Sequence, residues 1–80
     1  MTKDEIKHTI IEQILEIAPD IAEDEIKPNE NIQRSLEIDS FDFLKILTAL
    51  NQKTGIEVPE ADYAKVDTLE KMTDYFFERL

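Results

Sequence analysis

The sequence has no cysteine and no tryptophan, and its 80 residues include one histidine and one glycine. Without cysteine the chain has neither a disulfide scaffold nor a zinc knuckle. With only three prolines as further helix breakers, the composition is typical of a mostly helical protein. No apolar run approaches the about 20 residues of a membrane span, and the charged start Met1–Glu5 is unlike a signal peptide. We therefore expect a cytoplasmic protein without membrane insertion.

Basic residues are also scarce, since nine Lys and Arg stand against 19 Asp and Glu, for a formal net charge of −10. Such a charge repels nucleic acid and anionic membranes and steers basic partners toward the protein. Most of the acidic residues are expected simply to keep a small protein soluble. The acidic segment 19–38 lacks the glycine of an EF-hand loop, and His8 has no second ligand near it. No metal site is predicted.

Apolar residues at helical spacing predict three longer helices. The first begins at a capping box of Thr2 and Glu5, runs to about residue 18 and is closed by Pro19. The second covers about residues 40–53 and stops at Gly55. The inward residues of the first helix are Ile6, Ile10, Ile14 and Ile17, widened by Ile11 and Leu15. Those of the second are Phe43, Ile46, Leu47, Leu50 and Thr54.

The last helix is predicted to start at a capping-box-like pair, Asp67 and Glu70. Its inward residues are Leu69, Met72, Phe76 and Leu80, with Thr73 and Phe77 alongside. A short helix of about residues 60–64 precedes it, with Tyr63 and Val66 facing inward, and residues 56–59 are extended because of Pro59.

The long connection at 19–38 needs anchors, since loops of this length are uncommon in compact domains. The expected anchors are Ile21, Ile26, Ile32 and Leu36, and a helical turn is possible near residues 22–25. Residues 1–80 are thus expected to form one all-α domain, a small bundle of three longer helices and one short helix.

Ser40 stands at the start of the second predicted helix, next to Phe41, an aromatic residue on the solvent-facing side of that helix. Phe41 falls opposite the inward face, beside Lys45 and Thr48, so this end of the helix suggests a contact surface. A serine nucleophile needs a base, but His8 lies on another helix and no G-x-S-x-G turn is present. The chain is therefore not expected to be an enzyme. Ser40 is either part of a helix cap or a serine that another protein modifies.

The stretch Leu36-Glu37-Ile38-Asp39-Ser40-Phe41, with the order and spacing of helices around it, resembles the acyl carrier protein family and its peptidyl carrier relatives. Their signature is Asp-Ser-Leu at the start of the second helix, preceded by Leu-Gly-x, and the resemblance covers nearly the whole chain. It implies that Ser40 carries 4′-phosphopantetheine as a phosphodiester, flanked by Asp39 and Phe41. A separate phosphopantetheinyl transferase adds the group from coenzyme A. With no cysteine in the chain, the arm supplies the thiol for a thioester.

Three departures from the family pattern carry expectations of their own. Glu37 replaces the usual Gly, so a positive φ there would be strained. Phe43, inward and one turn after Ser40, is expected to shorten or redirect any cavity for the cargo. Acidic carriers of fatty acid synthesis have a row of glutamates along the second helix, which this chain lacks. Partners are therefore expected to read shape more than charge. The expected docking residues are Phe41, Asp42, Leu44, Lys45 and Thr48.

Three functions remain open from the sequence. The first is an acyl carrier for fatty acid, specialised lipid or polyketide-type biosynthesis, and the second is an aminoacyl or peptidyl carrier, including a D-alanyl carrier. The third is an acidic helical adaptor that is never modified. For a carrier, the expected partners are the phosphopantetheinyl transferase and acyl-transfer or acyl-activating enzymes, and the expected state is a monomer.

Overall fold

The computed structural model describes residues 1–80 and contains helices throughout, with one isolated bridge between Asn31 and Thr68 in place of any β-strand. The elements are α1 (Lys3–Ile17), the 3-10 turn η1 (Glu23–Glu25), α2 (Ile32–Ser35), α3 (Ser40–Thr54), the 3-10 helix η2 (Glu60–Val66) and α4 (Leu69–Arg79). The predicted all-α bundle is confirmed. Each helix falls short of the length or the apolar character needed to cross a membrane.

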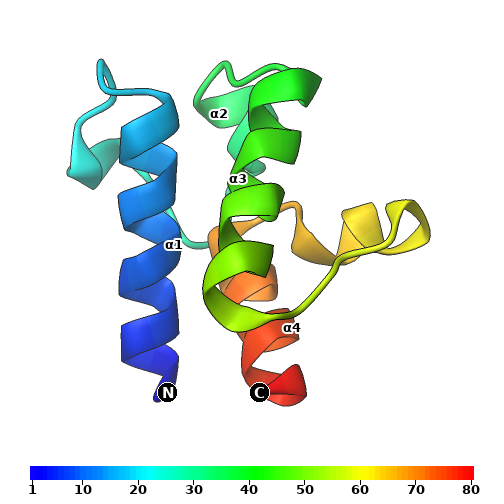
Figure 1. The fold of residues 1–80 in the computed structure, drawn as a ribbon. Coiled ribbons are helices and arrows are strands. Elements are labelled where there is room, and N and C mark those ends of the chain that lie inside the picture. The colour runs from blue at the N-terminus through cyan, green and yellow to red at the C-terminus, as the bar shows by residue number, and fades with distance from the viewer.

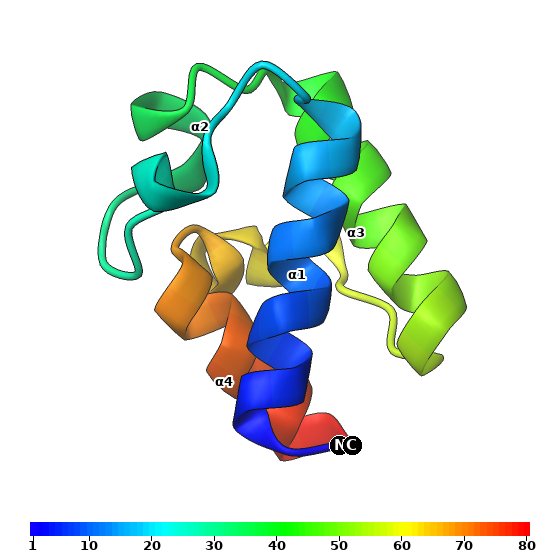
Figure 2. The same ribbon diagram turned by 90° about the vertical axis from the view of Figure 1, so that its left-hand side faces the viewer.

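The three long helices enclose one apolar core. α1 and α3 run antiparallel, and α1 also packs against α4 (Figures 1 and 2). Ile10 of α1, Ile46 of α3 and Phe76 of α4 are completely buried where these helices meet. Fully burying a side chain of this size stabilises the fold by about 1.5–3 kcal/mol. The stripes read from the sequence therefore describe the core correctly for most of its positions.

The ends of α1 and α3 follow the predicted caps. Thr2 Oγ1 accepts from the Glu5 amide at 3.2 Å, and the Thr2 amide donates to Glu5 Oε1 at 2.9 Å. This backbone hydrogen bond holds the pKa of Glu5 below its ordinary value. Gly55 ends α3 with φ +76°, a left-handed conformation in which glycine has no side chain to strain.

The prediction for the start of α4 was wrong by one residue. Thr68, not Asp67, is the cap, and its Oγ1 accepts from the Lys71 amide at 3.1 Å. A cap residue needs an extended backbone, which Thr68 has at φ −124° and ψ 160°, whereas Asp67 has helical angles at the end of η2. The Asp67 carboxylate lies 3.2 Å from Lys71 Nζ instead.

Two residues assigned to the inward stripe of α4 face outward. Leu80 follows the last helical residue and is 52% exposed, so its helical register no longer applies. Phe77 is 40% exposed and lies under Lys3 Nζ, 5.4 Å from its ring centroid. Tyr75, which the sequence analysis left out, is buried in their place.

The long connection between α1 and α3 is pinned to the start of α4. Ile26 and Ile32 are buried as predicted, and Ile21 and Leu36 are half-buried. The Ile32 amide donates to the Asp67 carbonyl at 2.8 Å. The expected turn near residues 22–25 is η1. The sequence analysis missed α2, which Asn31 could have indicated, because its side chain caps this helix by accepting from the Arg34 amide at 2.9 Å.

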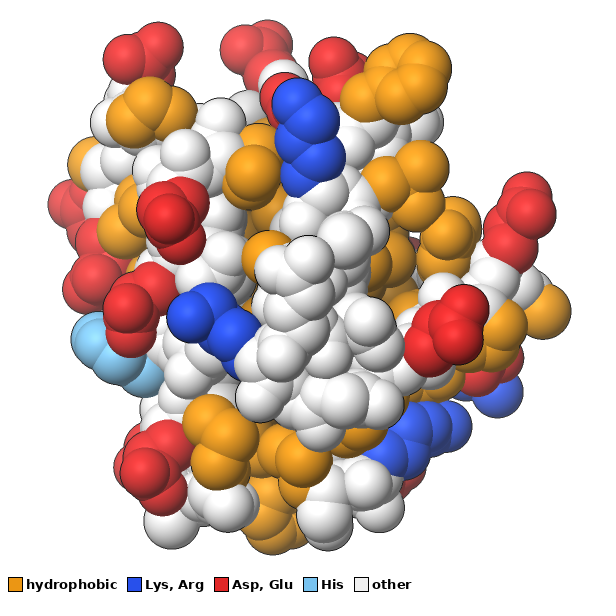
Figure 3. Space-filling view, in the orientation of Figure 1, with side chains coloured by type: hydrophobic (Ala, Val, Ile, Leu, Met, Phe, Trp, Pro, Cys, Tyr) orange, Lys and Arg blue, Asp and Glu red, His pale blue; other side chains and the backbone are white.

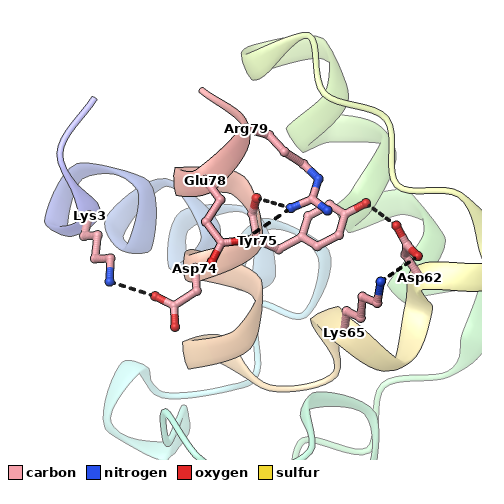
Figure 4. A network of polar contacts seen from close by, with 7 residues as sticks. All are labelled: Lys3, Asp62, Lys65, Asp74, Tyr75, Glu78 and Arg79. Carbon is pink, nitrogen blue, oxygen red and sulfur yellow. Dashed lines mark hydrogen bonds and ion pairs between the residues drawn. The ribbon is translucent and has the colours of Figure 1, made fainter.

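η2 is held on α4 by a cluster of polar contacts around Tyr75 (Figure 4). The Tyr75 hydroxyl donates to Asp62 Oδ2 at 2.7 Å, and Lys65 Nζ lies 3.4 Å from the same carboxylate. The Arg79 guanidinium stacks 3.5 Å from the centre of the Tyr75 ring. Burial and the bond to Asp62 raise the pKa of Tyr75, and the same bond lowers the pKa of Asp62.

Tyr75→Phe is expected to lower the midpoint of thermal unfolding at pH 7, because the variant loses the bond between Tyr75 and Asp62. Since the folded pKa of Asp62 lies below its ordinary value of 3.8, this stabilisation is present above that value. It disappears as the pH falls through the lowered pKa. Thermal melts followed by circular dichroism from pH 7 to pH 2 should show the two proteins converging at the acid end. A constant difference across this range would contradict the assignment.

Candidate functional site

Ser40 is the first residue of α3, and its side chain is exposed. Asp39 caps the helix, since its Oδ1 accepts from the Asp42 amide at 2.8 Å and its carbonyl accepts from the Phe43 amide at 2.9 Å. The amides of Ser40 and Phe41 are the two left open in this first turn. An esterified phosphate on Ser40 would meet these amides and the positive end of a 15-residue helix. The local chemistry therefore fits a phosphodiester at this position.

The chain has one other serine, and its surroundings are less suited to a phosphate. Ser35 is also exposed, but it is the last residue of the four-residue helix α2. The backbone groups that point outward at a helix C-terminus are carbonyls, which repel an anion. The two serines thus offer a matched pair with similar exposure and opposite helix ends.

The backbone just before Ser40 is strained at Glu37. This residue has φ +54°, which makes it the one non-glycine residue with a positive φ. The left-handed conformation brings a Cβ atom too close to the following carbonyl oxygen, at a cost of about 1–2 kcal/mol. The sequence analysis anticipated strain here if φ were positive, and the structure has that φ. The Glu37 side chain is exposed, so no burial of this side chain offsets the cost.

Glu37→Gly is expected to raise the free energy of unfolding by about 1 kcal/mol, because glycine adopts this φ without steric cost but loses more chain entropy on folding. Urea titration of the variant and the wild type measures the difference. Glu57→Gly, at an exposed position with ordinary φ, is the control and should be less stable than the wild type. Equal or lower stability of Glu37→Gly would show that the strain is relieved in solution.

The outer face of α3 is apolar near Ser40 and nearly uncharged beyond it. Phe41 is 78% exposed and Leu44 is 40% exposed. With four further residues they line a shallow groove of about 360 Å³, the others being Lys45, Thr48, Ala49 and Gln52. Lys45 Nζ lies 3.7 Å from Asp42 Oδ1, which offsets the acidic charge of this turn. All five residues expected to dock partners therefore lie on or beside one exposed face.

A second groove, of about 320 Å³, separates α3 from η2. Its lining includes Leu44, Leu47 and Val58. Tyr63 of η2 also lines it and packs edge to face against the buried Phe43, with 6.3 Å between ring centroids. This aromatic pair stands between the groove and the core. Sequence periodicity predicted that both rings face inward, but not that they touch.

The site contains no base that could activate Ser40. The single histidine, His8, lies on α1 with its Nε2 3.2 Å from Glu12 Oε1. The carboxylates closest in sequence to Ser40 are those of Asp39 and Asp42. The Asp39 carboxylate accepts a hydrogen bond from the Asp42 amide, and the Asp42 carboxylate forms an ion pair with Lys45. The arrangement leaves the Ser40 hydroxyl exposed and supplies none of the groups needed to deprotonate it.

Comparison with known proteins agrees with this geometry. A family model described as a phosphopantetheine attachment site matches residues 8–76. An acyl carrier protein of Rubrobacter xylanophilus is 31% identical over 75 residues, covering 90% of this chain and 93% of the relative. An acyl carrier protein of Campylobacter lari is 29% identical over 72 residues, covering 90% of this chain and 87% of the relative.

Both relatives are covered for most of their length. Members of this family interact with a phosphopantetheinyl transferase and with acyl-handling enzymes, and they do not catalyse reactions themselves. From the family match and the two relatives together, the chain belongs to the acyl carrier protein family and carries a covalently attached 4′-phosphopantetheine.

Proposed function

We propose that Ser40 is the attachment point of the arm and that the protein carries acyl groups on it as thioesters. The observation that supports Ser40 most strongly is its place at the start of α3, exposed and beside two open amides. The 4′-phosphopantetheine arm, when bound, supplies the thiol that the chain itself lacks. The names of the two relatives favour acyl cargo over aminoacyl or D-alanyl cargo.

The outer face of α3 is the proposed docking surface for the enzymes that load and unload the arm. Phe41 and Leu44 offer an apolar contact within one turn of Ser40, and the hydroxyl of Thr48 is already bonded to the Leu44 carbonyl at 2.9 Å. Charged contacts are fewer, since Lys45 is paired with Asp42 on this face. We infer recognition by shape at this surface, which favours a dedicated pathway such as a specialised lipid or polyketide-type product.

A monomer suits this function because the carrier must enter the active sites of several enzymes. The experiment that tests the proposal is incubation of the purified protein with coenzyme A and a phosphopantetheinyl transferase of broad specificity. Intact mass should rise by about 340 Da, the size of one phosphopantetheine group. Peptide mapping should locate the added mass on Ser40. A chain that stays unmodified would leave the acidic adaptor as the better interpretation.

A further inference from the structure

The groove between α3 and η2 combines an apolar lining with polar side chains that bond to nothing else in the chain. Leu47 and Val58, both buried, belong to the apolar part. The polar part comes from Asn51 of α3, Glu57 of the connection and Tyr63 of η2. These three side chains make no hydrogen bond or ion pair within the protein. An apolar lining with a few convergent polar groups is typical of a site for a small molecule.

The walls of this groove are fixed from behind. In the space-filling view, hydrophobic side chains show in the hollow between α3 and the segment that carries η2, and acidic side chains stand at its edge (Figure 3). The wall formed by η2 is held on α4, because Asp62, next to Tyr63, accepts from the Tyr75 hydroxyl at 2.7 Å. The contact between Tyr63 and Phe43 closes the groove toward the core. A site whose walls are already in place loses less entropy when a ligand enters it.

Ser40 lies on the same side of α3 as this groove. One line of side chains runs along this side at spacings of four, three and four residues, and it consists of Ser40, Leu44, Leu47 and Asn51. The last three of these line the groove. Asn51 lies about three helical turns after Ser40, which is about 16 Å along the helix axis. The backbone of a phosphopantetheine arm is about as long as five extended residues, or about 17 Å. An arm that follows this line therefore brings its thiol to the level of Asn51.

We propose that the groove selects acyl groups with a hydroxyl on one of their first carbons, and that Asn51 and Tyr63 recognise this hydroxyl. The inference rests on the proposed attachment at Ser40. A hydroxyl close to the thioester would lie among the Asn51 amide, the Tyr63 hydroxyl and the Glu57 carboxylate. A chain of methylenes gives these groups no hydrogen bond in exchange for the water that they lose. An amide and a phenol are uncharged and Glu57 is exposed to water, which favours a neutral hydroxyl over a charged amine as the ligand.

The test compares two acyl groups of the same length on the protein. A transferase of broad specificity loads Ser40 from hexanoyl- or β-hydroxyhexanoyl-coenzyme A, and intact mass verifies that loading is complete. The rate of thioester cleavage by hydroxylamine is measured for each loaded protein. It is divided by the rate for the same coenzyme A thioester, which removes the difference in intrinsic reactivity. One hydrogen bond of ordinary strength changes an equilibrium by about threefold to tenfold, so the hydroxylated group on the wild type should be protected about threefold better.

A double variant tests the two residues that recognise the hydroxyl. Asn51→Leu with Tyr63→Phe removes both uncharged polar groups but keeps the ring that packs on Phe43, so the preference should disappear. Gln33→Leu removes a half-buried amide on α2 outside the groove, and this control should keep the preference. Circular dichroism verifies that both variants fold. Equal protection of the two acyl groups on the wild type overturns the proposal, and so does a preference that survives in the double variant.

A second measurement needs no variant. In isotope-labelled wild type, the side-chain amide resonances of Asn51 should differ between the hexanoyl and the β-hydroxyhexanoyl form, because only the second form offers a hydroxyl. Identical resonances in the two forms would contradict the proposal. Failure of the proposed function looks different, because the wild type would then gain no mass on Ser40 with either coenzyme A thioester.

Discussion

Replacing Ser40 by alanine is expected to abolish attachment of the phosphopantetheine arm completely. The substitution removes the one oxygen that is both exposed and adjacent to the open amides of Ser40 and Phe41, and it leaves the cap made by Asp39 intact. The variant should therefore fold as the wild type does. Intact mass after incubation with coenzyme A and a transferase of broad specificity should show no gain, where the wild type gains about 340 Da.

Ser35→Ala is the matched control for this experiment, since it removes the other exposed serine of the chain. It should reach the same final mass as the wild type. A Ser40→Ala protein that still gains mass would move the attachment to another residue. If mass gain were lost in Ser35→Ala alone, the helix-end argument developed for these two serines would be wrong.

Replacing Phe43 by alanine is expected to cause the largest loss of stability near the site. Phe43 is 4% exposed and packs edge to face against Tyr63. Removing a buried phenyl ring costs about 3–5 kcal/mol, while a domain of this size has roughly 4–12 kcal/mol in total. Urea unfolding of the unmodified variant should show this loss, with a midpoint far below that of the wild type.

The same substitution should change how cargo affects stability. Without the ring of Phe43, the groove between α3 and η2 gains access to the core, and each methylene that enters contributes about 0.8 kcal/mol. Melting temperatures are measured for both proteins loaded with acyl groups of two to ten carbons. We expect a steady rise with chain length in Phe43→Ala and an early plateau in the wild type. The same dependence in both proteins would mean that Phe43 does not limit the cavity.

The sequence predicted the long helices well because their signals are local. Apolar residues at helical spacing identify α1 and α3, and a capping box with Thr2 or a glycine at position 55 marks where they begin or end. Ser40 was predicted as the attachment site from the short stretch around it and from its expected place at a helix start. For Glu37 the expectation was conditional: a positive φ at this position would be strained, and the structure has that φ.

What could not be predicted depends on contacts between distant parts of the chain. Asp67 and Thr68 both suit a cap, and the choice is settled by η2, whose helical backbone continues through Asp67. The hydrogen bond from the Ile32 amide to the Asp67 carbonyl joins two residues that lie 35 positions apart in the sequence. The surface pocket lined by Ile17 and Asp42 likewise needs the end of α1 to meet the start of α3. The spacing of apolar residues within one helix contains no information about contacts between distant segments.

The position of the two chain termini has a practical consequence. They lie side by side at the end of the bundle opposite the start of α3, where Lys3 reaches Asp74 at 3.0 Å (Figures 1 and 2). A linker, an affinity tag or a solid support joined to either terminus would therefore project away from the face that enzymes approach. Several copies strung together or anchored to a surface would each keep a free arm, which makes this carrier a suitable module for immobilised multi-enzyme synthesis.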